Sequence, residues 1–147
     1  MGRHSFIFRP GSWSGEGKVT LSSSTEPLSF RTRWQIPPED ERGIVFCTQE
    51  IRIAGLSDVM NNRFAVFDIG STGFSIKLEN QSIGEVVGAG LIRKKLLGWE
   101  FRLHEMGFEG FEFYEAEGEG SGYRLHAEYV ASDDFRTTIH GKIRSVT

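Results

Sequence analysis

Apolar and polar residues alternate along most of the chain with a repeat of two, which is typical of β-strands that bury one face. In LSFRTRWQI, every second position from Leu28 to Ile36 is apolar or threonine, and most residues between are polar. FSIKLE from Phe74 and LGWEFRL from Leu97 repeat this alternation. No segment has the 3.6-residue repeat of an amphipathic helix. The pattern predicts ten strands, at residues 12–21, 27–36, 44–54, 62–69, 72–79, 85–92, 97–104, 110–117, 122–131 and 135–144.

The connections between these strands are short and rich in turn residues, so consecutive strands are expected to pair as antiparallel hairpins. Cross-strand partners must lie on the same face, which tests each register. Pairing the strands around RKKL places Gly90 opposite Trp99, and pairing the first two strands places Gly15 opposite Trp34. In both hairpins a glycine leaves room for a large ring.

Two further registers follow from the same rule. A tight turn at residues 70–71 places Phe67 opposite Phe74, so that two apolar faces match. The register of the last two strands makes His126 and His140 direct neighbours on the polar face. A register shifted by one residue would mix apolar and polar faces in the last hairpin.

Ten strands with one apolar face and few helices to cover it need either a second sheet or closure on themselves. Closure removes the exposed strand edges, and up-and-down connections make it straightforward. The sequence therefore predicts a single all-β domain over residues 1–147, an antiparallel up-and-down β-barrel of about ten strands. A barrel of that size favours a lumen. A two-sheet sandwich is the alternative architecture.

Aromatic residues form the predicted binding region. They are Trp13, Trp34, Trp99, Phe30, Phe74, Phe101, Phe111 and Phe113, with Tyr129 on the ninth predicted strand. As a functional site, they would line a pocket that holds a flat or lipid-like molecule by area and shape. The same residues would equally make a packed core, because small residues opposite large ones can also fill space. Trp13 is expected to plug one end of the barrel.

Length, charge and cysteine content narrow the function classes. The chain of 147 residues suits one domain, and its net charge of −3, with both signs interspersed, lacks the footprint of a nucleic-acid binder. No stretch approaches the roughly 20 apolar residues of a membrane helix, so no membrane insertion is expected. Cys47 is the only cysteine, which excludes an internal disulfide, favours burial of the thiol and fits a reducing, cytoplasmic location. A homodimer is compatible with the sequence.

The opening GSWSGEG, followed by PLSFRTRW, resembles the start of calycin-type barrels, in which a Gly-x-Trp on the first strand closes one end. The G-x-W-x-G-x-G pattern with the following P-x-x-F is most similar to nitrobindin-like haem-binding barrels. This resemblance implies ten strands without a helical lid, and a haem ligated by a histidine on the last strand. Thr138 aligns with the position of that ligand, and His140 is the histidine nearest to it in the sequence.

Two groups of polar residues are further candidates. His126, His140 and Glu128 are expected on one face and could hold zinc, although the same residues fit a solvated outer surface. Arg102 is expected opposite Glu112 as a surface ion pair of small energetic value.

These features leave three functional hypotheses. The first, which we favour, is a carrier or sensor that binds a small hydrophobic molecule, lipid-like or a tetrapyrrole such as haem, without covalent chemistry. The second is a calycin-type isomerase or lyase, for which Tyr129 or Glu50 would supply the inward-facing acid or base. The third is a filled barrel that acts as an interaction module.

Overall fold

The computed structural model describes residues 4–103, 107–118, 121–131 and 135–146, and these residues form ten β-strands and no helix. The strands are β1 (Gly11–Leu21), β2 (Leu28–Ile36), β3 (Val45–Ile53), β4 (Val59–Phe67), β5 (Gly73–Asn80), β6 (Gly84–Ile92), β7 (Leu96–Leu103), β8 (Phe108–Glu117), β9 (Gly122–Val130) and β10 (Arg136–Ser145). Within the described ranges, no helix is long and apolar enough to cross a membrane.

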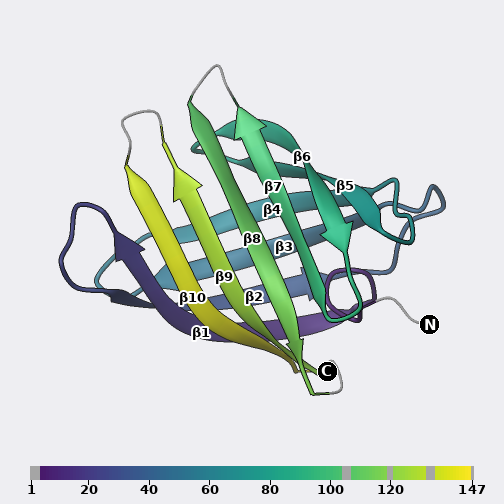
Figure 1. Ribbon diagram of the computed structural model, residues 1–147, viewed down its shortest axis with the longest axis horizontal. Coiled ribbons are helices and arrows are strands. Elements are labelled where there is room, and N and C mark those ends of the chain that lie inside the picture. The colour runs from purple at the N-terminus through teal and green to yellow at the C-terminus, as the bar shows by residue number, and fades with distance from the viewer. Residues whose placement is uncertain (1–3, 104–106, 119–120, 132–134, 147) are drawn as a thin grey trace.

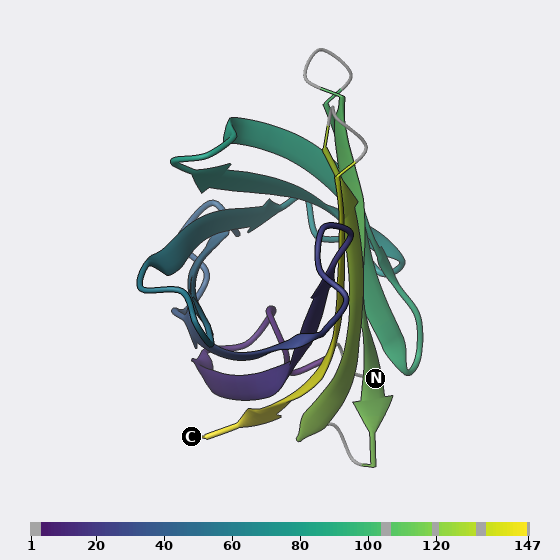
Figure 2. The same cartoon turned by 90° about the vertical axis from the view of Figure 1, so that its left-hand side faces the viewer.

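The strands form one closed antiparallel barrel (Figure 1). Each strand pairs with its neighbour in the sequence, and β1 pairs with β10 to close the ring. Figure 2 shows the barrel turned by 90°, with β8, β9 and β10, coloured green to yellow, along one side of the ring. The predicted all-β up-and-down barrel is therefore confirmed. The predicted strand ends also agree to within a few residues, except that the expected end of the seventh strand at His104 lies outside the described residues.

Two of the four predicted registers are confirmed. β6 and β7 pair with Gly90 opposite Trp99, and β9 and β10 pair with His126 opposite His140. β7, β9 and β10 alternate clearly in sequence, so a slip of one residue would turn their inward-facing apolar side chains toward solvent.

The registers of the other two hairpins differ from the prediction. Thr32 lies opposite Gly15, and Trp34 lies opposite Trp13, a shift of two residues that keeps the same faces inward. The β4–β5 pair is shifted by one residue, with Ser75 opposite Phe67. The shift reverses the predicted faces of β4, because its apolar run has no alternation that would fix an inward face.

The glycines of β1 are required where the strand approaches its neighbours closely. Gly17 lies opposite both Phe30 of β2 and Gly141 of β10. A Cβ atom at Gly17 would lie 2.8 Å from the Phe30 ring and 2.1 Å from the His140 carbonyl oxygen. A glycine of β1 thus leaves room for an aromatic ring, but the pair is Gly17 with Phe30 and not the predicted Gly15 with Trp34. At Gly90 the ring that fills the space of a Cβ atom is that of Phe74 on β5 and not the predicted Trp99.

One end of the barrel, here called the closed end, is filled by the segment 4–10 that precedes β1. Phe6 is fully buried and packs with its ring centroid 5.4 Å from that of Trp13 and 5.2 Å from that of Trp34. His4 Nε2 donates to the Arg93 carbonyl oxygen (2.6 Å), and His4 Nδ1 lies 2.9 Å from the Tyr123 hydroxyl. Trp13 therefore lies at a plugged barrel end, together with a segment that the alternation pattern did not reveal.

Candidate functional site

Most of the predicted aromatic residues face inward, and the structure brings them together as a packed core. The inward-facing ones with 6% exposure or less are Trp13, Trp34, Trp99, Phe30, Phe74 and Phe101. The Trp34 ring stacks on Phe64 at a centroid distance of 5.1 Å, and Trp99 lies 5.2 Å from Tyr114. The closed-end half of the barrel is thus filled by aromatic side chains and the segment 4–10.

Phe111 and Phe113 do not line the interior, contrary to the sequence interpretation. Phe113 lies opposite Gly98 and His126, both on the outer face, and its ring occupies the position that a Cβ atom at Gly98 would take. Phe111 lies 5.8 Å from the His126 ring on the same face. The inward face of β8 carries Glu112 and Tyr114 instead.

His140 also faces outward, so it cannot ligate a haem inside the barrel. It is exposed, and its Nδ1 lies 3.1 Å from His126 Nδ1. The pairing of β10 with β9 is continuous through His140, without a bulge that would turn the ring inward. His126 Nε2 lies 3.0 Å from Glu128. Among the described residues, however, no three histidine, cysteine, aspartate or glutamate side chains are placed to hold a metal.

At the barrel end opposite the closed end, inward-facing apolar side chains remain accessible to solvent. We call this end the mouth, and Figure 2 views the ring from this side. Its half-buried residues are Leu21, Leu28, Ile51, Ile53, Phe108, Tyr129 and Ile139. At the closed end, by contrast, inward-facing residues such as Trp34, Val45 and Leu97 are fully buried. The barrel therefore has one filled end and one end where apolar surface is open to solvent.

A buried carboxyl group lies between the filled half and the mouth. Glu112 is 8% exposed and faces inward from the middle of β8, opposite Trp99 and Ala127. The Tyr114 hydroxyl, on the closed-end side, donates to Glu112 Oε1 at 2.6 Å, and the Tyr129 hydroxyl, on the mouth side, donates to Oε2. Both oxygens of the carboxyl group thus accept hydrogen bonds from tyrosines.

Burial is the main influence on the ionisation of this cluster. It raises the pKa of Glu112, and the hydrogen bonds from the two tyrosines oppose that shift only in part. Burial, together with the neighbouring Glu112 charge, holds the pKa values of Tyr114 and Tyr129 well above their usual range, so both hydroxyls keep their protons and remain donors.

The cluster was not predicted, because Glu112 was assigned to the surface. The expected partner, Arg102, lies opposite Glu109 and pairs with Glu100 instead. The sequence signal that identifies the cluster is the spacing of Glu112 and Tyr114, which puts both on one face of a strand. Glu50, the other proposed acid or base, faces outward and pairs with Arg52, whereas Tyr129 faces inward as that hypothesis requires.

A second set of polar side chains crosses the interior on β2 to β5. Gln49 Nε2 donates to Thr32 Oγ1 (3.1 Å), and Asn62 Nδ2 donates to Gln49 Oε1 (2.9 Å). Asn80 Nδ2 in turn donates to Asn62 Oδ1 (3.0 Å). These side-chain amides hydrogen-bond to one another, so they form an uncharged polar row across the barrel from Glu112.

Cys47 is buried in the same region, as predicted, and burial raises its pKa to about 12.

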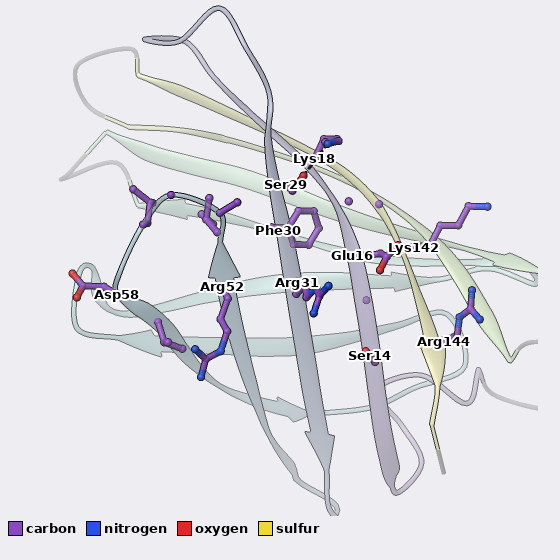
Figure 3. A pocket seen from close by; sticks show the side chains of 18 of the residues that line it. Ser14, Glu16, Lys18, Ser29, Phe30, Arg31, Arg52, Asp58, Lys142 and Arg144 are labelled. Carbon is purple, nitrogen blue, oxygen red and sulfur yellow. Dashed lines mark hydrogen bonds between the residues drawn. The ribbon is translucent and has the colours of Figure 1, made fainter.

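A groove of about 1230 Å³ lies against the outer face of β10, β1, β2 and the end of β3 (Figure 3). Its charged residues are Lys18, Arg31, Arg52, Lys142, Arg144, Glu16 and Asp58. Arg31 and Arg52 are direct cross-strand neighbours, an arrangement that is unfavourable for like charges. The groove is lined by both polar and apolar residues, and because Ile53 is one of them, the groove adjoins the mouth.

Comparison with protein-family models, with curated proteins and with solved structures gives no match to this chain. The fold and the site together define the class of the protein as a closed ten-stranded antiparallel barrel with one plugged end. This architecture is compatible with the calycin-like fold that the opening residues resemble.

Proposed function

We propose that the barrel binds a small hydrophobic molecule in its mouth and acts as a carrier or sensor without covalent chemistry. The observation that carries the proposal is the contrast between the two ends. Apolar side chains that face inward at the closed end are buried by protein, whereas those at the mouth are left half-buried. Covering this surface with an apolar molecule would contribute about 25 cal/mol per Å² of apolar area removed from water.

The proposed site differs from the one expected from the sequence. The rings of Trp34, Trp99 and Phe74 are packed against each other and against the segment 4–10, so they lie on the closed-end side of the proposed site. The ligand would contact the aliphatic residues of the mouth, with Phe108 and Tyr129 as its aromatic neighbours. Haem is not part of the proposal, because His140 faces outward.

The test uses decan-1-ol, a neutral probe, with binding measured by isothermal titration calorimetry. Ile53→Arg places a charge at the mouth and is expected to weaken binding at least about tenfold, because the apolar contact is replaced by a hydrated group. Val87→Arg is the matched control, since Val87 is 57% exposed on the outer face of β6. It should leave binding unchanged.

Two results would contradict the proposal. One is the absence of saturable binding to the unmodified protein, which would favour the filled-barrel interaction module. The other is equally tight binding to Ile53→Arg and to the unmodified protein, which would place the probe elsewhere on the surface.

A further inference from the structure

We propose that the mouth selects a hydrophobic molecule that carries a positively charged amine, with Glu112 as its counter-ion. This inference rests on the proposed function, since it names the chemical class of ligand for the same site. It follows from the charge of the interior, the hydrogen bonds of Glu112 and the position of this residue between the filled half and the mouth.

The interior carries an acidic group without a basic partner. By register and alternation, the inward-facing positions of the ten described strands include one carboxylic acid, Glu112, and no lysine, arginine or histidine. A carboxylate enclosed by apolar side chains is costly unless it is paired with a cation. Among the described residues the strands supply no such cation, and the buried His4 contacts the Tyr123 hydroxyl and the Arg93 carbonyl oxygen instead. The cost is therefore met either by a proton on Glu112 or by a cation that a ligand brings, and the comparison of probes below distinguishes the two.

The hydrogen bonds of Glu112 leave part of its acceptor capacity unused. Tyr114 and Tyr129 both donate, and the 2.6 Å distance from Tyr114 lies within the range of hydroxyl groups bound to a carboxylate. A carboxylate offers about four acceptor positions, and the tyrosines occupy two of them. An ammonium group has three N–H donors and no acceptor, so it complements the positions that remain.

The surroundings of Glu112 on the mouth side also favour a cation. Tyr129 is half-buried and stacks on Phe108, with ring centroids 5.7 Å apart and an interplanar angle of 18°. The faces of aromatic rings attract cations, particularly in sites from which water is excluded. The Tyr129 ring lies over Gly110, whereas Ala127, the inward-facing neighbour of Glu112, is small. An ammonium group bound beside Ala127 would contact Tyr129 and Glu112 while its apolar chain extends through the mouth toward solvent.

The same geometry discriminates against other head groups. A fatty acid would bring a second carboxylate to a buried negative charge, and like charges without a shared proton repel strongly in such a site. A neutral alcohol would bury the same apolar area and donate one hydrogen bond, without the charge pairing. The expected order of affinity is therefore amine, then alcohol, then carboxylate.

The test compares decylamine, decan-1-ol and decanoate, which share a ten-carbon chain, by calorimetric titration of the full chain at pH 7.5. The unmodified protein should bind decylamine at least about tenfold more tightly than decan-1-ol, and decanoate more weakly than either. Glu112→Gln keeps the size of the side chain and removes its charge, so the variant should bind decylamine and decan-1-ol about equally. Glu85→Gln, a solvent-exposed acid at the start of β6 near the mouth, is the matched control and should keep the amine preference.

The outcomes separate the two proposals. Binding of decan-1-ol without a preference for decylamine overturns the amine inference and leaves the hydrophobic site standing. A preference for decanoate also overturns it, because Glu112 would then hold a proton. If Glu112→Gln retains the preference, or Glu85→Gln loses it, the selective charge is not Glu112. If none of the three probes binds the unmodified protein, the proposed function itself fails. The comparison of probes on the unmodified protein stands even if Glu112→Gln does not fold.

Discussion

Glu112 couples the stability of the barrel to pH. Burial raises the pKa of Glu112 above its ordinary value of 4.5, so the folded protein holds this proton more tightly than the unfolded chain does. Between the ordinary and the raised pKa this group binds more protons in the folded state than in the unfolded state, so its contribution to stability falls as pH rises through that window. Below pH 4.5 the full contribution of the protonated form is present.

Glu112→Gln removes this dependence and provides the measurement. The difference in unfolding free energy between the unmodified protein and the variant should decrease as pH rises from 4.5, by about 1.4 kcal/mol for each unit of pKa shift, and then level off. Urea denaturation across pH 4 to about 9 would measure it. The solvent-exposed variant Glu85→Gln should show little such trend. A constant difference for Glu112→Gln would mean that burial does not perturb this carboxyl group.

The sequence could not assign the face of β8, and the reason lies in four residues. Phe111, Glu112, Phe113 and Tyr114 alternate between two faces, and both faces carry a large ring. The usual rule places the charged residue in solvent, which would bury Phe111 and Phe113. Here each carboxyl oxygen of Glu112 accepts a hydrogen bond from a tyrosine, one of them on the next strand, so the rule fails at the residue that most distinguishes the candidate site.

At the level of elements, the apolar alternation of β7, β9 and β10 made two hairpin registers predictable. The β6–β7 and β9–β10 registers were predicted correctly, because a slip would have moved apolar residues to the polar face. β4 was misassigned because the continuous run FAVF, from Phe64, fits either face. In β1, Leu21 pairs with Thr137 of β10, while the pairing of β1 with β2 ends at Val19. The sequence offers no local signal for that difference.

The segment before β1 acts as part of the core, although it lacks the alternation of a strand. Phe6→Ala removes a fully buried ring that packs on Trp13 and Trp34, so a loss of about 3–5 kcal/mol in unfolding free energy is expected. Phe46→Ala, at a position 49% exposed, is the control and should cost much less. Thermal and urea unfolding measure both values. Equal losses in the two variants would show that the segment 4–10 does not plug the barrel in solution.

At the level of the whole molecule, the barrel is closed by two strands from opposite ends of the chain. β1 and β10 pair over nine residue positions from Trp13 to Leu21, so closure joins the first strand to the last. Without this pairing, both strands would expose a free edge. The predicted up-and-down strand order implied that the first strand would pair with the last, because only closure gives both terminal strands a neighbour at their free edges. The close approach at Gly17 and Gly141 depends on the register of three strands and was visible only in the structure.

Gly17→Ala tests this closure directly. The added methyl group would lie 2.1 Å from the His140 carbonyl oxygen and 2.5 Å from the Gly141 Cα atom, and backbone cannot move aside as a flexible side chain would. The strands must separate locally, at a cost of about 1–3 kcal/mol. Amide hydrogen exchange should then accelerate along β1 and β10 while the β5–β6 pair keeps its protection.

Gly70→Ala is the control, because its methyl group would meet only the Gly73 carbonyl oxygen, at an ordinary 3.5 Å. Unchanged exchange in β1 and β10 of Gly17→Ala would mean that the two strands are not in close contact at Gly17, and the barrel would then have to close in another register.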